Sequence, residues 1–281
     1  MVLVVAAIGL VAVALSRPAA PVTTTPPAPG LAPAAAALAA VRPATFDAVG
    51  TTAGTVLAAP VVPPPGPAAV TLTRDGRPEI LFVGSEFCPF CAAERWPLVL
   101  ALTRFGRFTA LRDGVSTATA AFPSLATFSF ADARYVSPYL ALTAVEQYSG
   151  RVGPGGAYLP SAALTPAQAG LVAAITAQTG QGAVAPVVDI AGRLVGVGSA
   201  VSPALFVGLS AGQITSQVTD PPDLPAKGDP PAAAPPTGRA VVAAANQLTA
   251  GMCAATGQRP ASVCRSTGVR EAAASLGLPP A

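Results

Sequence analysis

The chain has 281 residues and a formal net charge of +3, with 32 prolines, 27 glycines, four cysteines and no histidine. The absence of histidine excludes a Ser-His-Asp triad, an H-E-x-x-H zinc helix and any histidine-ligated metal. The 16 basic and 13 acidic residues form no basic cluster, so we expect no nucleic-acid partner.

The chain starts with an uninterrupted apolar run of 14 residues, Val2–Leu15. A helix of this length rises about 21 Å, which is short of the ~30 Å hydrocarbon core of a bilayer. The run fits either a signal-peptide h-region or the C-terminal half of a membrane anchor whose true start lies upstream, and an exposed apolar helix is a third alternative. We expect residues 1–16 to form an anchor, which would place the rest of the chain outside the cytoplasm.

Residues 17–43 are expected to form a Pro/Ala-rich tether, because six prolines fall between Pro18 and Pro33. A segment of this composition extends rather than folds. The folded domain is expected over residues 44–219, beginning with a short strand at Thr45–Gly50.

The apolar run Glu79–Gly84 has the length and composition of a strand buried on both faces. It leads into a C-P-F-C motif whose cysteines are Cys88 and Cys91. Helical spacing of the following apolar residues predicts a helix to about Phe105, with Pro97 expected to kink it. Cys88 is therefore expected at or next to the N-cap of this helix.

The rest of the chain is expected to alternate strands and helices. The expected elements are strands at 126–130 and 139–145, a Gly/Pro loop at 152–160, a helix at 165–178, strands at 183–190 and 193–197, and a helix at 202–218. A linker is expected over residues 220–237, which contain seven prolines. A C-terminal helical pair, residues 238–281, carries Cys253 and Cys264.

The C-x-x-C motif lies where redox chemistry needs it, after a buried strand and at the start of a helix. Unpaired N–H groups at a helix N-terminus stabilise the first cysteine as a thiolate, and the thiolate is the nucleophile in disulfide exchange. The spacing lets the second sulfur attack a mixed disulfide and release the product. We predict that Cys88 attacks and that Cys91, a turn further along and buried, resolves.

Structural roles for these cysteines are the alternatives. A zinc site would need Cys253 and Cys264 as further ligands, but a C-x₂-C with a distant C-x₁₀-C is not a zinc-knuckle spacing. The other alternative is a static disulfide between Cys88 and Cys91. The redox interpretation is preferred because motif and strand–helix context agree.

The order of the expected elements resembles a thioredoxin fold. In thioredoxin-like folds a cis-proline before a β-hairpin faces the cysteine pair, and here Pro186 precedes an expected strand, glycine turn and strand. The resemblance implies an α/β thioredoxin-like fold, with about 60 residues inserted after the active-site helix and a C-terminal helical extension. Pro186 is the candidate cis-proline, and an ordinary trans proline is the alternative.

The stretch Phe82–Trp96, FVGSEFCPFCAAERW, resembles the signature of a membrane-associated family, domain of unknown function 929. Further similarities lie at TFSF (127–130), SPY (137–139) and ANQLTA (245–250), which leads to Cys253 and Cys264. The resemblance extends over roughly residues 44–278 and implies a thioredoxin-like fold with an extra C-terminal cysteine pair. It implies no established reaction.

Four neighbours of the motif are candidate supporting residues: Glu86, Phe87, Arg95 and Trp96. Glu86, like Glu94, would be a proton shuttle for the buried thiol or a solvated surface carboxylate, and we prefer the surface role. Arg95 would stabilise a thiolate or form a helix-surface salt bridge, and the sequence favours neither. Phe87 and Trp96 are expected to shield the site and fill the core, with substrate binding as the alternative.

Cys253 and Cys264 have two interpretations. In an exported protein we expect a structural disulfide that clamps the helical pair. The alternative is a second redox pair that exchanges electrons with Cys88 and Cys91.

These features predict a membrane-tethered, extracytoplasmic thiol–disulfide oxidoreductase that acts on exported proteins, in a direction that the sequence leaves open. No flavin, nicotinamide or metal motif is visible, so we expect no cofactor and an unidentified membrane or extracytoplasmic protein as electron partner. The alternative from a different class is a redox-inert thioredoxin-like scaffold whose disulfides are structural.

Overall fold

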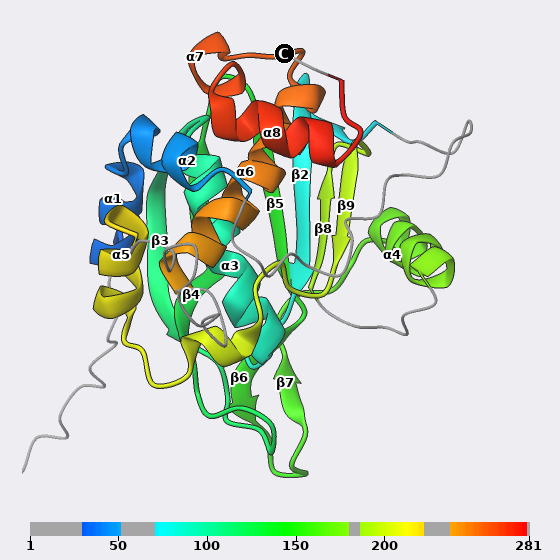
Figure 1. Cartoon of the computed structure of the whole chain (residues 1–281). Coiled ribbons are helices and arrows are strands. Elements are labelled where there is room, and N and C mark those ends of the chain that lie inside the picture. The colour runs from blue at the N-terminus through cyan, green and yellow to red at the C-terminus, as the bar shows by residue number, and fades with distance from the viewer. Residues whose placement is uncertain (1–29, 52–70, 180–185, 222–236, 280–281) are drawn as a thin grey trace, which may run out of the picture.

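The computed structural model describes residues 30–51, 71–179, 186–221 and 237–279, and a mixed sheet lies at its centre (Figure 1). The long strand β2 (Arg77–Gly84) pairs in parallel with β5 (Ala141–Glu146) and antiparallel with β8 (Val187–Ile190). On the far side of β8 lies β9 (Leu194–Val197), and the two-residue β1 (Thr73–Arg74) pairs with the start of β2. The strand order is thus β5-β2-β8-β9, and the fold is mixed α/β, as the sequence predicts.

Helices cover both faces of this sheet. Alternate residues of a strand point to opposite faces. Ile80 and Phe82 face the core formed with α3 (Pro89–Thr103) and α6 (Thr237–Ala255). Their neighbours Leu81 and Val83 belong to a second cluster, formed with α4 (Pro166–Thr179). All four side chains are buried, which explains why β2 is apolar toward both faces from Ile80 to Val83.

A second antiparallel pair, β3 (Arg107–Val115) and β4 (Ala126–Val136), lies beside α3. Trp96 of α3 packs against Phe128 of β4, with ring centroids 4.6 Å apart. Its indole N–H donates a hydrogen bond of 3.0 Å to the Ala126 carbonyl. α3 is therefore held between the central sheet and β4.

A third antiparallel pair extends beyond the carboxyl end of β5: β6 (Tyr148–Val152) and β7 (Tyr158–Pro160). We expected a loop at residues 152–160, so the strand β7 corrects this prediction. The run of glycines forms only the tip of the hairpin. This hairpin and α7 (Ala261–Cys264) lie at opposite ends of the molecule in Figure 1.

The first described residues, 30–51, contain two helices, in contrast to two predictions. α1 (Pro33–Ala39) lies within the expected tether, and Ala32 N–H donates to the Leu111 carbonyl of β3 at 2.7 Å. The expected strand at Thr45–Gly50 is instead α2 (Pro43–Val49). Its buried Phe46 and Val49 are three residues apart, which suits a helix with proline at its first position better than an alternating strand.

Two of the helices expected after β9 are each divided into two shorter ones. The expected helix at 202–218 consists of the 3₁₀-helix η1 (Pro203–Phe206) and α5 (Ala211–Thr219). Gly208 separates them with a φ of +76°, and Ser210 then forms a capping box that starts α5. The last expected helix is also divided, into α7 and α8 (Thr267–Ser275).

The C-terminal helices belong to the same core as the central sheet. Asn246 of α6 donates hydrogen bonds of 2.9 Å to the carbonyls of Phe46 and Gly50, at the end of α2. Gly268 at the start of α8 lies so close to Phe46 that a Cβ there would be 2.5 Å from its carbonyl oxygen. The last segment of the chain therefore packs directly against its first described helices.

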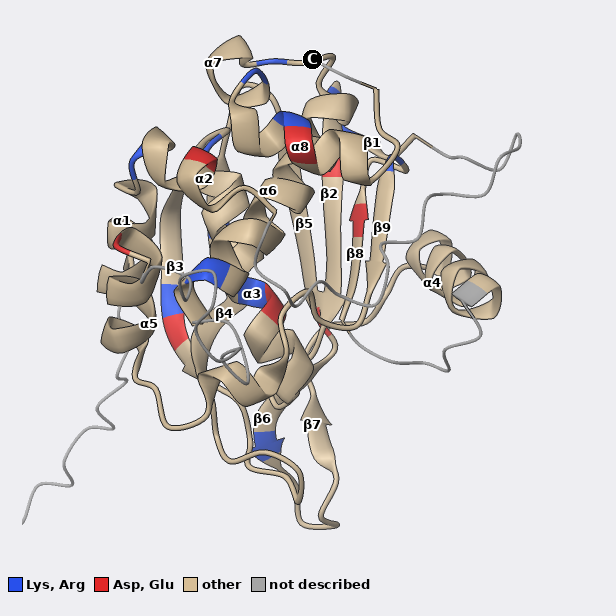
Figure 2. Cartoon of the chain, in the orientation of Figure 1, with Lys and Arg blue, Asp and Glu red and all other residues tan. Residues whose placement is uncertain are grey.

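Several expected features lie outside the described residues: the apolar run Val2–Leu15, the first part of the tether, the start of the strand at 183–190 and most of the linker at 220–237. Among the helices that the structure describes, none combines the length and apolar character that a membrane span requires. Charged residues are scattered over the described elements, and in α3, β3 and α8 a basic residue lies next to an acidic one (Figure 2).

Candidate functional site

Cys88 occupies the N-cap of α3, as its spacing from the preceding strand predicts. Its backbone is extended (φ −78°, ψ 124°), and Pro89 takes the first helical position, where its missing N–H is not needed. The Cys88 sulfur accepts a hydrogen bond from the Cys91 N–H at 3.4 Å. A partly exposed sulfur is thus placed against the free N–H groups of a helix N-terminus.

Cys91 is completely buried one turn further along, and both cysteines are free thiols. Gly84, at the end of β2, makes room for its sulfur. A Cβ at this position would lie 2.6 Å from the Phe82 ring and 3.2 Å from Cys91 Sγ. A side chain at Gly84 would therefore clash with the Phe82 ring and crowd the second thiol.

The pKa values of the two thiols are shifted in opposite directions. The pKa of Cys88 is lowered to about 7, chiefly by a hydrogen bond from the Cys91 side chain, and also by backbone N–H groups and the positive charge of Arg95. Desolvation opposes this effect. Burial raises the pKa of Cys91 well above its ordinary value. At neutral pH about half of Cys88 is thiolate while Cys91 remains protonated.

Arg95 is buried beneath the cysteine pair in an ion pair with Glu146, at the end of β5. Its Nε and Nη2 donate to the two carboxylate oxygens at 3.0 and 2.8 Å. Nη2 also donates to the Ser85 carbonyl at 3.0 Å, and the guanidinium carbon lies 5.5 Å from the centre of the Phe82 ring. Arg95 therefore forms a buried ion pair rather than the helix-surface salt bridge weighed in the sequence.

Glu146 was not identified as a candidate site residue from the sequence. It lies 51 residues after Arg95 and outside any motif. One signal was present: Glu146 directly follows the strand expected at 139–145, and the carboxyl ends of neighbouring parallel strands meet at the same edge of a sheet. The register confirms the proximity, since Glu146 is paired with Gly84 just before the cysteine motif.

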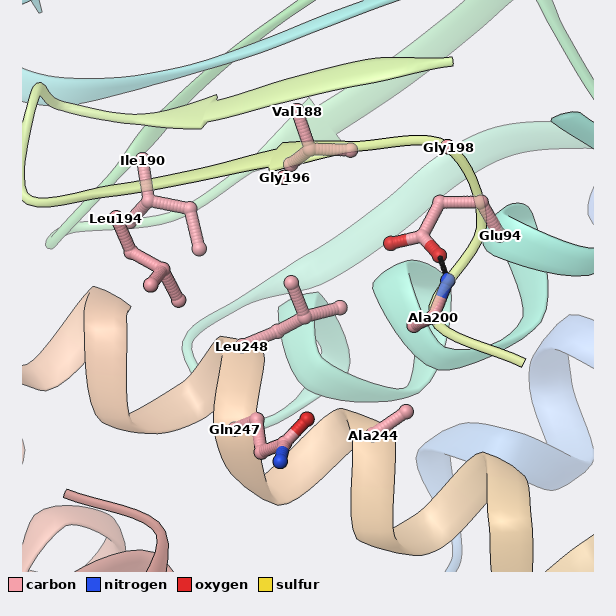
Figure 3. A pocket seen from close by; sticks show the side chains of 10 residues that line it. All are labelled: Glu94, Val188, Ile190, Leu194, Gly196, Gly198, Ala200, Ala244, Gln247 and Leu248. Atoms are coloured by element: carbon pink, nitrogen blue, oxygen red, sulfur yellow. Dashed lines mark hydrogen bonds between the residues drawn. The ribbon is translucent and has the colours of Figure 1, made fainter. Parts of the chain in front are cut away.

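Glu94 is also buried, with 2% of its surface exposed, so the preferred interpretation as a solvated carboxylate is wrong. One carboxylate oxygen accepts a hydrogen bond from the Ala200 N–H at 2.5 Å, and the other points into a small cavity between α3, the β8–β9 hairpin and α6 (Figure 3). The cavity has a volume of about 20 Å³, room for about one water. Burial raises the pKa of Glu94 to about 8.

Glu86 and Phe87 lie beside Cys88 and hold the neighbouring hairpin. The Glu86 carboxylate accepts a hydrogen bond from the Ser129 hydroxyl of β4, and the Glu86 N–H donates to the Tyr148 carbonyl at 2.9 Å. The Phe87 ring stacks on Tyr158 of β7, with centroids 3.8 Å apart. Trp96, in contrast, is completely buried away from the surface.

A second aromatic contact starts from within the motif. Phe90, within the motif, is 42% exposed and meets Phe122 of the β3–β4 connection edge to face at 5.8 Å. Tyr148 of β6 is also 42% exposed. Phe87 and Phe90, which lie on either side of Cys88 in the sequence, are therefore in contact with aromatic rings from β6, β7 and the β3–β4 connection.

Pro186 is buried immediately before β8. The pairing of Val83 with Val187 brings it next to Gly84, at the end of β2. Its carbonyl accepts a hydrogen bond from Gly198 N–H at 2.8 Å. Ala185 lies outside the described residues, and so does the peptide bond whose cis form we expected.

Cys253 and Cys264 form a disulfide that joins the end of α6 to α7. Both are buried, with 1% and 0% of their surface exposed. The disulfide lies at the α7 end of the molecule, whereas Cys88 lies at the end where β2 and β5 lead toward the β6–β7 hairpin (Figure 1). The structure does not bring the two cysteine pairs together.

The chain is thus a mixed α/β protein with a free C-x-x-C pair at the junction of a central strand and a helix N-terminus. Residues 68–152 match the family model described as Domain of unknown function (DUF929), which confirms the family resemblance over this part of the chain. The matched residues include both free cysteines, Arg95 and Glu146. Comparison with curated proteins and with solved structures gave no match.

Proposed function

We propose that this protein is a thiol–disulfide oxidoreductase in which Cys88 attacks and Cys91 resolves. The observation that carries the proposal is the inequality of the two thiols. Cys88 is partly exposed with a pKa of about 7, whereas Cys91 is buried with a raised pKa. A pair with only a structural role has no need of this division.

The reaction is a transfer of two electrons between protein disulfides. The Cys88 thiolate attacks one sulfur of a client disulfide, so a Cys88–client bond forms and the other client sulfur leaves and takes up a proton. Cys91 then loses its proton and attacks Cys88, which releases the second client sulfur. The client is reduced and Cys88–Cys91 becomes a disulfide; the reverse sequence oxidises a client dithiol.

We propose a thioredoxin-like fold for the domain that carries the pair. Support comes from the order β5-β2-β8-β9, from the parallel pairing of β2 with β5 and from the helix that follows each of these two strands. In this fold the expected insertion of about 60 residues would be two insertions. One is the β3–β4 pair and the other the β6–β7 hairpin, because β5 between them belongs to the central sheet.

We propose protein clients exported from the cytoplasm, met by a domain tethered to a membrane. The tether rests on the sequence alone, through the apolar run Val2–Leu15. The Cys253–Cys264 disulfide favours an oxidising compartment, where structural disulfides persist. The exposed rings of Phe90 and Tyr148 next to Cys88 favour clients with apolar side chains around their cysteines.

The decisive experiment traps the mixed disulfide. The full-length chain with Cys91→Ser is expected to form a covalent complex with a reducible protein disulfide, and the complex should disappear on adding a strong thiol reductant. The matched control Cys88→Ser should form none. If the Cys91→Ser chain traps no client, the protein is a redox-inert scaffold and the proposal is wrong.

The direction of transfer follows from the reduction potential of the wild-type pair, measured against glutathione. A potential of about −120 to −180 mV would indicate an oxidase or isomerase, and one near about −270 mV a reductase. A pair that stays oxidised until below about −300 mV would behave as a structural disulfide and would overturn the catalytic proposal. Trp96, five residues from Cys91 and packed on Phe128, provides a fluorescence signal for the titration.

A further inference from the structure

Arg95 carries a hydrogen-bond donor that the structure leaves unsatisfied. Its Nε and Nη2 are held by Glu146 and by the Ser85 carbonyl, whereas Nη1 is buried and has no partner among the described residues. A buried N–H without an acceptor is rare in native proteins, because burial removes the water that would otherwise satisfy it. This donor therefore requires an explanation.

The candidate acceptor for this donor is the sulfur of Cys91. Cys91 and Arg95 are four residues apart, so they lie on the same face of α3, and both are completely buried. The electrostatic interaction of Arg95 is stronger with Cys91 than with Cys88. As a neutral thiol Cys91 needs no counter-charge, but as a thiolate it would be an anion without access to water.

We propose that Arg95 stabilises the Cys91 thiolate in the resolving step, and that Glu146 holds the guanidinium in place for it. The inference rests on the proposed function of the pair. The guanidinium has two nitrogens clamped by Glu146, so the third is available to donate to the sulfur once it becomes charged. The Ser85 N–H, which also interacts with Cys91, is a second donor to the same sulfur.

The step balances without a further reactant. Cys91 gives up a proton and its sulfur attacks Cys88, so the Cys88–client bond breaks and the Cys88–Cys91 bond forms. The client sulfur leaves with the electron pair and takes up one proton, which balances the proton lost by Cys91. Arg95 stays protonated throughout and contributes its charge and a hydrogen bond.

The test separates attack from resolution. A chromogenic aryl disulfide reacts with the reduced full-length chain in two phases: Cys88 releases the first aryl thiolate, and Cys91 releases the second. The double variant Arg95→Met/Glu146→Leu removes the ion pair without leaving a lone buried charge. We expect its second phase to be slower by about tenfold or more, the effect of about one pKa unit, with a much smaller change in the first.

Two further variants make the result specific. Arg95→Lys keeps a positive charge next to Glu146 but lacks the guanidinium nitrogen that would donate to the Cys91 sulfur, so its second phase should slow several-fold. Arg104→Met is the matched control, because it removes a partly buried guanidinium from the C-terminal end of the same helix and should leave both phases unchanged. If the double variant does not fold, as judged by circular dichroism, Arg95→Lys decides.

Wild-type resolution rates in Arg95→Lys and in a folded double variant would overturn the inference. Failure of the proposed function has a different signature. In that case the wild-type chain itself shows no first phase with the aryl disulfide, and the Arg95 variants have nothing to slow.

Discussion

The two cysteine pairs of this chain differ in everything except residue type. Cys88 and Cys91 are free thiols at a strand–helix junction, one of them partly exposed. Cys253 and Cys264 are joined by a disulfide in the core at the other end of the molecule. Exposure of one sulfur and hydrogen bonds to its thiolate make a pair reactive, whereas burial of both sulfurs makes a pair inert.

The substitution Cys88→Ser is expected to have the largest effect on activity. A serine hydroxyl is not ionised near neutral pH and cannot form a disulfide, so Cys88→Ser should abolish reduction of the aryl disulfide. The measurement is the release of aryl thiolate by the reduced chain. The double variant Cys253→Ser/Cys264→Ser should react at the wild-type rate, and a loss of reactivity there would mean that the second pair takes part.

Removal of the buried disulfide should instead lower stability. Cys253→Ala/Cys264→Ala opens a loop closed over 11 residues, and the free energy of unfolding should fall by about 2–3 kcal/mol. Urea unfolding of the two proteins measures the difference. An unchanged midpoint would show that the disulfide is not a clamp, and would reopen the relay interpretation.

Glu94 is a further buried group, a carboxyl group in the core, whose burial should affect stability. Its folded-state pKa of about 8 lies above the ordinary value of 4.5, so the folded protein binds the proton more tightly than the unfolded chain. Stability should therefore fall as pH rises from about 4.5 through about 8.

Glu94→Gln keeps an acceptor for the Ala200 N–H and removes the titration. The variant should be more stable than wild type at pH 8.5 by about 1–3 kcal/mol, and equally stable near pH 4. Thermal unfolding at the two pH values measures this. A constant difference across the range would mean that Glu94 does not titrate in the core.

Cys91 is expected to control the acidity of its partner. The largest cause that lowers the pKa of Cys88 is the hydrogen bond from the Cys91 side chain, so Cys91→Ala should raise the pKa of Cys88 above about 7. Less thiolate is then present at pH 7, and alkylation by iodoacetamide should slow by up to about tenfold. A pH profile whose midpoint does not move would assign the acidity to the helix N-terminus instead.

The smallest expected effect concerns clients. Phe90→Ala removes an exposed ring without opening the core, so the folded state and the reaction with the aryl disulfide should change little. Reduction of a protein disulfide should slow about threefold, because apolar contact next to Cys88 is lost. Equal slowing with both substrates would show that Phe90 affects the sulfur and not the client. Val207→Ala, also at an exposed apolar position, is a matched control.

The motif and its surroundings could be predicted from the sequence because their signals are local. The second half of β2, from Ile80 to Gly84, is apolar at every position, a proline starts α3, and the two cysteines are three residues apart. The strand at residues 45–50 was predicted wrongly because a short apolar segment is compatible with either a helix or a strand. In the structure this segment is helical and contacts Asn246 and Gly268, which lie about 200 residues later in the chain. The division of residues 202–218 depends on one glycine with positive φ.

The sequence by itself determined the cysteine motif and its local setting: a C-P-F-C pair after a buried strand, with Cys88 at the N-cap of a helix. These features depend on spacing within about a dozen residues, and that spacing does not depend on how distant segments of the chain pack. The tertiary structure alone decided that Glu94 is buried, that Arg95 meets Glu146, and that the second cysteine pair lies far from the first. Burial and ion pairing depend on which distant segments cover a side chain, and no local pattern specifies that.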